Sequence, residues 1–274
     1  FCRFISQIDP DGNIIFQQYV ELDCIREIPR ASRYYALAEG ADFKATNLRL
    51  KDGLYQFDVE TPEGLIRDVG LGIPGMINIE NALSVVAIAR LLNIGDDMVR
   101  KALNTFSGVK RRFDLKINRT GMVYIDDYAH HPRELDACIH SVRKIYPDRK
   151  ITGIFQPHLY SRTRDFAGDF ARSLSRLDVL ILLDIYPARE EPVEGVDAGL
   201  IFNQVDMADK VLIQKEQLMR VLEERRPEVL LTLGAGDIWK VGEEVLQRLS
   251  RAAASHTGSD SGEDACRALH AHLA

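Results

Sequence analysis

The sequence predicts an α/β protein whose larger part is a Rossmann-like, mostly parallel sheet with helices on both faces. In the second half of the chain, short apolar runs rich in branched residues alternate with segments of amphipathic helical spacing. Nearly continuous apolar strands separated by such helices are typical of a parallel sheet that is covered on both sides. Polar sequence follows several of these runs, which predicts a ligand-binding edge where the strands end.

The composition is that of a globular protein. The chain has 274 residues, of which 46% are hydrophobic and 28% charged, so it is long enough for two domains with sizeable cores. The formal net charge of -6 argues against a nucleic acid or an anionic membrane as the main partner. No apolar run reaches the roughly 20 residues of a membrane span, and the first residues do not resemble a signal peptide.

The cysteines and the first residue give two further expectations. The four cysteines are widely scattered and form no C-x-x-C pair, which predicts reduced thiols and a cytoplasmic location. Because the chain starts at Phe1 rather than at a methionine, we expect it to have been cut from a longer protein.

Residues 1–73 mix short alternating segments with turn signals. The clearest is a β-hairpin, in which Asp52 and Gly53 join two segments of period-2 alternation at 46–50 and 54–59. This part of the sequence carries no candidate site.

An apolar helix is predicted after a glycine-rich turn at 70–75. Glycine lets the backbone approach a ligand closely, and Asn78 and Asn81 are three residues apart, so both side chains can point to one side of the helix start. The alternative is that Asn78 is simply the N-cap of this helix. A second short helix is expected at 96–103.

The segment 106–113 interrupts the pattern and is interpreted as the domain junction. It contains Lys110, Arg111 and Arg112 in succession. Such a cluster could be a solvated charge run, or its arginines could bind phosphates through bidentate contacts.

Most of the polar chemistry follows the short strand predicted at 123–125. Between this strand and a helix that begins near Pro132 lie two carboxylates, a phenol and two imidazoles: Asp126, Asp127, Tyr128, His130 and His131. The free N–H groups of a helix start favour anions there. Taken singly, an aspartate could be a helix cap and the histidines could be solvated. A zinc site is weakly indicated, because adjacent histidines do not share a helix face.

After this stretch the sequence settles into strand–helix alternation. Strands are predicted at 151–155, 179–183, 210–213 and 229–233, and helices at 134–146, 164–176, 215–225 and 237–249. Polar segments at 156–163, 184–192 and 234–237 should open on the same sheet edge as the 126–132 stretch, because parallel strands share a direction. The 234–236 segment is not a full G-x-G-x-x-G fingerprint, so a dinucleotide site there is weakly indicated. Residues 250–274 are predicted to be a disordered tail.

Five segments together resemble the Mur ligase family, the ATP-dependent enzymes that add amino acids to the peptidoglycan precursor. They are 75–81 (GMINIEN), 106–113 (FSGVKRRF), 126–132 (DDYAHHP), 155–163 (FQPHLYSRT) and 184–190 (DIYPARE). The resemblance covers residues 1–249, and the last three segments together are specific.

The resemblance implies a domain division. Residues 1–107 would be the C-terminal part of the central, ATP-binding domain, and residues 108–249 the complete C-terminal Rossmann-like domain. The sequence has no G-x-x-x-x-G-K-[ST] motif, so the usual phosphate loop and its Mg²⁺-binding hydroxyl are missing. Ile77 stands where many family members have a histidine, so an adenine contact from that position is lost.

The family reaction activates the muramyl carboxylate as an acyl phosphate, which the amine of the amino acid then attacks. The resemblance implies ATP, Mg²⁺, UDP-N-acetylmuramate and L-alanine as the ligands. It implies nucleotide contacts from Asn78, Asn81, Arg112 and Asp127. It also implies an L-alanine pocket made by Tyr128, His130, His158 and Arg162, with Arg162 gripping the substrate carboxylate. No residue of the chain is assigned a chemical step, and the chain alone is expected to be inactive.

Two other functions remain open. A ligase that recycles a tripeptide onto the same sugar nucleotide shares the Arg-Arg and DDYAHHP-like segments, but is not expected to share HLYSRT or DIYPAR. A noncatalytic nucleotide- or sugar-binding module is the alternative from another class.

Overall fold

A computed structural model describes residues 2–9, 11–20, 32–37, 39–119 and 121–256 of the chain. The chain divides into two compact units, which we describe separately. The first comprises Phe1–Phe113 and Asp136–Pro147, and the second comprises Asp114–Leu135 and Asp148–Ala274. Helix α4 (Pro132–Ile145) therefore begins in the second unit and ends in the first. Among the described residues, no helix is long and apolar enough to cross a membrane.

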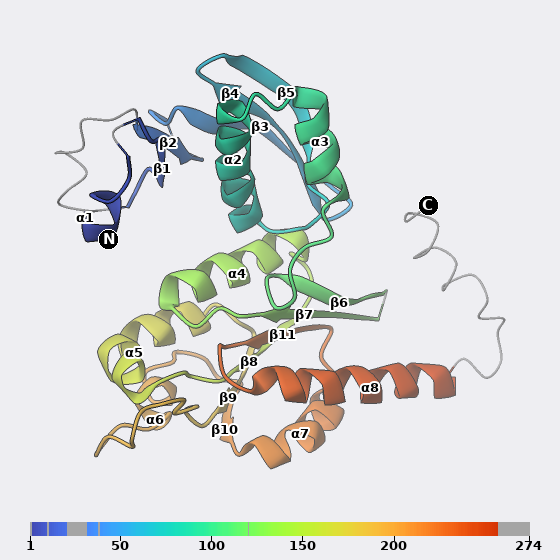
Figure 1. The fold of residues 1–274 in the computed structure, drawn as a ribbon. Helices are drawn as coiled ribbons and strands as arrows, with labels where there is room; N and C mark the ends of the chain where they lie inside the picture. The colour runs from blue at the N-terminus through green and yellow to red at the C-terminus, as the bar shows by residue number, and fades with distance from the viewer. Residues whose placement is uncertain (1, 10, 21–31, 38, 120, 257–274) are drawn as a thin grey trace. The chain divides into compact units, whose positions relative to one another are not determined.

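The first unit contains a five-stranded sheet in the order β1-β2-β3-β4-β5 (Figure 1). The pairs β1–β2 and β2–β3 are parallel, whereas β3–β4 and β4–β5 are antiparallel. The strands are β1 (Ile14–Gln17), β2 (Ser32–Ala36), β3 (Phe43–Lys51), β4 (Leu54–Thr61) and β5 (Gly64–Gly70), and a short helix α1 (Cys2–Ile5) precedes them.

The predicted hairpin is confirmed. Strands β3 and β4 pair with Lys51 opposite Leu54, and the two turn residues between them have positive φ values, 51° at Asp52 and 81° at Gly53. Positive φ at both central residues is the geometry of the tight hairpin turn that Asp-Gly favours. Strand β5 was not predicted, and its exposed and buried residues do not alternate regularly.

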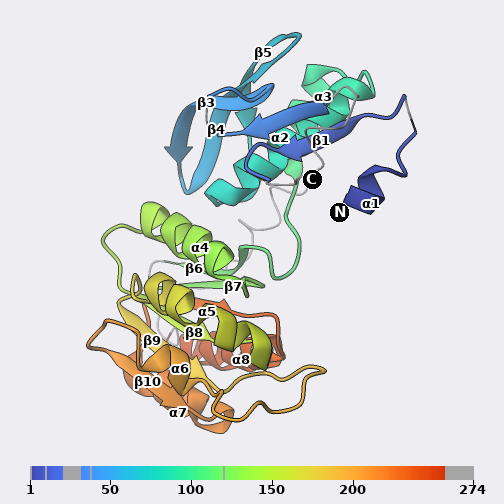
Figure 2. The ribbon, with the colours of Figure 1, turned by 90° about the vertical axis from the view of Figure 1, so that its left-hand side faces the viewer.

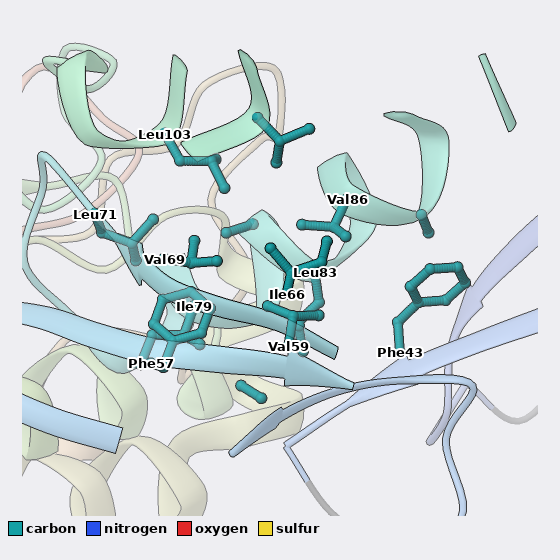
Figure 3. Close-up of a cluster of buried hydrophobic side chains, with 14 of the residues drawn as sticks. Phe43, Phe57, Val59, Ile66, Val69, Leu71, Ile79, Leu83, Val86 and Leu103 are labelled. Carbon is teal, nitrogen blue, oxygen red and sulfur yellow. The ribbon is translucent and has the colours of Figure 1, made fainter. Parts of the chain in front are cut away.

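Two helices pack against this sheet, α2 (Met76–Leu91) and α3 (Asp96–Thr105). Both were predicted, because their apolar residues recur at helical spacing. Their buried side chains meet those of β3, β4 and β5 in one core (Figure 3). Phe43 and Phe57 from the sheet and Ile79 and Leu83 from α2 are fully buried in it.

The second unit is built on a six-stranded sheet in the order β10-β9-β8-β11-β7-β6. All neighbouring pairs are parallel except β6–β7 at one edge. This confirms the predicted α/β class with a mostly parallel sheet. The strands are β6 (Asp114–Arg119), β7 (Met122–Asp127), β8 (Ile151–Phe155), β9 (Val179–Leu183), β10 (Lys210–Ile213) and β11 (Val229–Leu233).

Helices cover both faces of this sheet. On one face α7 (Leu218–Arg225) and α8 (Ile238–His256) share a core with alternate residues of the strands. On the other, Phe170 of α5 (Tyr160–Leu174) packs on Phe155 of β8 with ring centroids 5.3 Å apart. Figure 2 shows α5 beside the short α6 (Gly199–Phe202).

Several bounds differ from the prediction, most clearly in three helical segments. Helix α5 begins at Tyr160 rather than 164, a 3-10 turn (Lys215–Gln217) precedes α7, and α8 continues to His256, beyond the predicted end at 249. The rest of the predicted tail, 257–274, lies outside the described residues.

The expectation of reduced thiols is wrong at one position. Cys2 is disulfide-bonded, whereas Cys138 is a free thiol buried in α4.

Candidate functional site

The second unit brings the predicted polar segments to one edge of its sheet. Asp127 at the end of β7 is level with Leu233 of β11, which is level with Phe155 of β8. Phe155 in turn is level with Leu182 of β9. The segments that follow these four strands therefore start at neighbouring positions, as expected for parallel strands.

The two aspartates that end β7 are both buried. Asp126 accepts a hydrogen bond of 2.6 Å from the hydroxyl of Thr232, which also lies 3.1 Å from the Tyr124 hydroxyl. This carboxylate therefore belongs to a buried network between β7 and β11. Asp127 accepts a hydrogen bond of 2.7 Å from the backbone N–H of Ala129, which fixes the turn at the strand end.

Glu134, in the first turn of α4, holds the two histidines. Its Oε2 accepts hydrogen bonds from the backbone N–H groups of His130, at 2.9 Å, and His131, at 3.2 Å. The same oxygen lies 3.2 Å from Nδ1 of His130, and that nitrogen lies 2.9 Å from the carbonyl oxygen of Tyr128. Nδ1 of His130 thus has two oxygen atoms as neighbours, which orient the ring.

A row of four rings crosses the edge of the sheet. Tyr128 and His130 meet edge to face with centroids 5.2 Å apart, and His130 lies 6.2 Å from His158. His158 stacks on Tyr186, with centroids 5.8 Å apart and an interplanar angle of 19°. The structure thus brings together three of the residues predicted for the amino-acid pocket and adds a fourth ring. His131 turns elsewhere and contacts Phe166 at 4.9 Å.

His158 and Arg162 leave buried nitrogen atoms without a partner. Within the described part of the chain, Nδ1 of His158 and Nη1 of Arg162 have no hydrogen-bond partner. Burial, followed by the nearby charges of Arg162 and His130, lowers the pKa of His158 from its usual 6.5. His158 is therefore a neutral imidazole near pH 7, and Arg162 is a cation beside it. Buried polar atoms of this kind are usually satisfied, so their presence indicates a ligand site.

A glycine turn closes the edge beside Tyr186. A Cβ atom on Gly236 would lie 2.5 Å from Oε1 of Gln156 and 2.8 Å from the Tyr186 side chain, so glycine is needed for packing. Gln156 joins this turn to β8 by donating to Asp237 at 3.0 Å and accepting from the N–H of Ile238 at 3.0 Å. The 234–236 segment therefore has a structural explanation that does not require a dinucleotide.

Lys215 completes this corner from the 3-10 turn. Its ammonium lies 2.5 Å from Asp237. Burial acts to raise the pKa of Asp237, but the hydrogen bonds from Lys215 and Gln156 outweigh it and the pKa is lowered.

The asparagines of the first unit lie in the first turns of α2. Asn78 is buried, and its amide donates to the carbonyl of Pro74 at 2.6 Å, while the Asn81 amide lies 3.4 Å from the Asn78 side-chain oxygen. The N-cap of this helix is Gly75, with φ 101°, so the alternative in which Asn78 is the N-cap is wrong. The two side chains do lie together, as their spacing predicts.

Arg112 lies in the tight turn that ends the first unit. Its backbone N–H donates to the carbonyl of Val109 at 3.1 Å, and its neighbours Arg111 and Phe113 both have positive φ, 62° and 48°. Asp127 belongs to the second unit, so the expectation that Arg112, Asn78 and Asn81 share a nucleotide with it stays a prediction.

Two side chains of this edge were not among the predicted site residues. Tyr186 stacks on His158, and Glu190 accepts hydrogen bonds from Ser161 at the start of α5. Both lie in the polar segment 184–192, so the signal was present, but their partners lie in another segment of the chain. No group of three or more His, Cys, Asp or Glu residues suited to a metal occurs in the described ranges.

Comparison with known proteins places this site in a family context. Residues 111–236 match the family model described as Mur ligase, glutamate ligase domain. The UDP-N-acetylmuramate–L-alanine ligase of Parabacteroides distasonis is 47% identical over 251 residues, which are 92% of this chain and 54% of that protein. The chain thus spans about half the length of the curated relatives it matches.

Solved structures show the same fold. The UDP-N-acetylmuramate–alanine ligase of Thermotoga maritima superposes with a TM-score of 0.68 at 24% identity, over 80% of this chain and 48% of that one. A murein peptide ligase from Psychrobacter arcticus superposes with a TM-score of 0.59 at 19% identity, over 90% of this chain and 53% of that one. At these identities the likeness establishes the fold alone.

Proposed function

The chain belongs to the Mur ligase family, and on that premise we propose that the protein carrying it joins L-alanine to UDP-N-acetylmuramate at the expense of ATP. The sugar carboxylate would be activated as an acyl phosphate, which the alanine amine attacks. Such a reaction builds a peptidoglycan precursor from nucleotide-linked substrates, which fits a cytoplasmic location.

Arg162 supports the amino-acid half of this proposal most directly. Its guanidinium stands at the ligand-binding edge of the sheet with one buried nitrogen that no described residue satisfies. Arginine forms bidentate hydrogen bonds with carboxylates, so the carboxylate of L-alanine is a suitable partner.

The row of rings would form the rest of the pocket. Tyr128, His130 and His158 follow one another along the row, and the charge of Arg162 acts on His158. A neutral His158 can accept a hydrogen bond from the alanine ammonium group, which a protonated ring would repel. Holding the amine close to the acyl phosphate would be the main catalytic contribution of this unit.

Four residues are assigned to the nucleotide in this proposal. We assign to it Asn78 and Asn81 from α2, Arg112 from the turn after α3, and Asp127 from the end of β7. The asparagine amides suit adenine, the Arg112 guanidinium suits phosphate and the Asp127 carboxylate suits a ribose hydroxyl. The described residues offer no cluster that suits Mg²⁺, so we assign no step to the metal that accompanies ATP.

The proposal is tested by supplying two amino-acid substrates side by side. The complete gene product is assayed for ADP release with ATP, UDP-N-acetylmuramate and either L-alanine or the tripeptide of the recycling reaction. Efficient turnover with L-alanine, but not with the tripeptide, supports the proposal. A preference for the tripeptide would show that the protein is the recycling ligase, and no ATP turnover with either substrate would favour a noncatalytic binding module.

A further inference from the structure

Helix α5, which carries Arg162, begins at a strained residue. Its N-cap is Leu159, with φ 73° and ψ 136°, and the Leu159 side chain makes no capping hydrogen bond. A positive φ is unfavourable for a residue with a branched side chain, so the surrounding structure must hold it. The strand-like pairing of 157–159 with Tyr186 does part of this, because Leu159 donates to the Tyr186 carbonyl at 3.0 Å and Tyr186 donates to the Pro157 carbonyl at 2.8 Å.

Glu190 supplies the cap that Leu159 lacks. Its Oε2 accepts from the backbone N–H of Ser161 at 2.9 Å, and its Oε1 accepts from the Ser161 hydroxyl at 2.5 Å. The backbone N–H of Tyr160 also acts to lower the pKa of this carboxyl group. A carboxylate at a helix N-terminus satisfies N–H groups that have no partner within the helix and interacts favourably with the helix dipole.

The charge state of Glu190 matches this role. The Ser161 hydroxyl, followed by the Ser161 backbone N–H, lowers the pKa of Glu190 from its usual 4.5, and the Arg162 charge acts in the same direction. The carboxylate is therefore ionised at neutral pH.

The hydrogen bonds of Glu190 are made with Ser161 and not with Nη1 of Arg162. Glu190 is the acidic group whose charge acts on both Arg162 and His158, so it is the natural internal competitor for the guanidinium. Both of its oxygens are instead engaged by the first turn of α5, and Nη1 of Arg162 has no hydrogen-bond partner among the described residues. The cation is thus anchored next to an anion yet keeps a donor available for a substrate carboxylate.

We propose that Glu190 is a positioning residue for the amino-acid substrate: it anchors the first turn of α5 and thereby holds the Arg162 guanidinium ready for the substrate carboxylate. This inference rests on the proposed function. Glu190 itself touches no reacting atom, and its effect passes through Arg162.

The first test compares Glu190→Gln with Glu191→Gln in the complete gene product. Both variants lose one negative charge at adjacent positions, but Glu191 is exposed and lies outside the cap. Glu190→Gln should raise KM for L-alanine about five- to tenfold and change kcat and KM for ATP by less than about twofold, because only the helix cap is weakened. Glu191→Gln should leave all three values within about twofold of the wild type. Equal losses in kcat and in both KM values would indicate a general structural role and overturn the inference.

A double-mutant cycle tests whether the effect passes through Arg162. In the Arg162→Ala background, Glu190→Gln should raise KM for L-alanine by less than about twofold, because the group that it positions is gone. Fully additive effects would mean that Glu190 acts independently of Arg162, against the inference.

Amide hydrogen exchange separates failure of this inference from failure of the proposed function. The amides at the start of α5 should exchange at least about fivefold faster in Glu190→Gln than in the wild type, and no faster in Glu191→Gln. Unchanged exchange would disprove the cap. A wild-type protein that does not use L-alanine overturns the proposed function and this inference together, whereas an active wild type with an unaffected Glu190→Gln variant overturns this inference alone.

Discussion

Replacing Arg162 by alanine should selectively weaken the use of L-alanine. The guanidinium stands beside a neutral histidine with a buried donor available, so we expect one or two charge-assisted hydrogen bonds to the substrate carboxylate. Hydrogen bonds to charged groups contribute about 1.5 to 3 kcal/mol, and solvent at the partly exposed site argues for a total of about 2 to 3 kcal/mol. That corresponds to a loss of roughly 30- to 150-fold in kcat/KM for L-alanine.

The fold should tolerate this change. Within the described residues Arg162 donates no hydrogen bond through the buried Nη1, so truncation removes an unsatisfied buried atom rather than a structural contact. We therefore expect the melting temperature of Arg162→Ala to stay within about 2 °C of the wild type, equivalent to less than about 0.5 kcal/mol. Arg162→Lys keeps the charge but not the fork, and should fall between the wild type and the alanine variant.

The assay measures ADP release at saturating ATP and UDP-N-acetylmuramate while L-alanine is varied. Arg164→Ala is the matched control, because Arg164 lies two residues further along the same helix, is exposed, and pairs with Asp165 at 2.8 Å. It should change kcat/KM by less than about twofold. If Arg162→Ala raised KM for ATP as much as KM for L-alanine, the role assigned to Arg162 would be wrong.

Three further predictions concern stability and nucleotide binding. Because burial and neighbouring cations lower the pKa of His158, the unfolded chain takes up a proton at a higher pH than the folded chain. Acidification from about pH 7 to about pH 5.5 should therefore destabilise the wild type more than the His158→Gln variant. Equal pH profiles of the melting temperature for the two proteins would contradict this prediction. Thr232→Val removes a hydrogen bond from the buried Asp126 carboxylate and should lower the free energy of unfolding by about 2 to 3 kcal/mol in urea titrations. Thr152→Val, at a buried threonine of the neighbouring strand β8, is its control and should cost less than about 1 kcal/mol. The 274-residue chain, which has no G-x-x-x-x-G-K-[ST] motif, should show no micromolar binding of Mg²⁺-ATP by isothermal titration, and measurable hydrolysis of ATP would show that the nucleotide site is misplaced.

The strands of the second sheet were the most predictable part of the fold. Strands β8, β9, β10 and β11 have the predicted bounds, because each is a short apolar run bordered by polar sequence. Strand β6 was not predicted, since its sequence, DLKINR, is largely polar and its burial does not alternate. It is an antiparallel edge strand, which depends on pairing with β7 rather than on its own apolar pattern.

The start of α5 shows why a helix boundary can be missed. The prediction placed it at 164, whereas the helix begins at Tyr160 with a leucine in a left-handed conformation before it. The cap that permits this is Glu190, which is 29 residues away from Ser161 in the chain. Local sequence rules describe caps supplied from within the first turn, so they could not identify this one.

The location of the candidate site could be predicted from the sequence, but most of its side-chain contacts could not. The topology of a parallel sheet puts His130 and His158 on one edge, and the structure has them 6.2 Å apart. The stacking of Tyr186 on His158 and the engagement of Glu190 by Ser161 depend on how separate loops pack, which spacing along the chain does not encode. The roles of the individual residues toward L-alanine and ATP stay predictions.

A crystal structure of the complete gene product with UDP-N-acetylmuramate, L-alanine and a non-hydrolysable ATP analogue would test the central claim most directly. We predict that the alanine carboxylate lies about 3 Å from two guanidinium nitrogens of Arg162, with its amine facing His158. An alanine bound away from the edge that carries Tyr128, His130 and His158, or an Arg162 paired with Glu190 while the amino acid is bound elsewhere, would contradict the account.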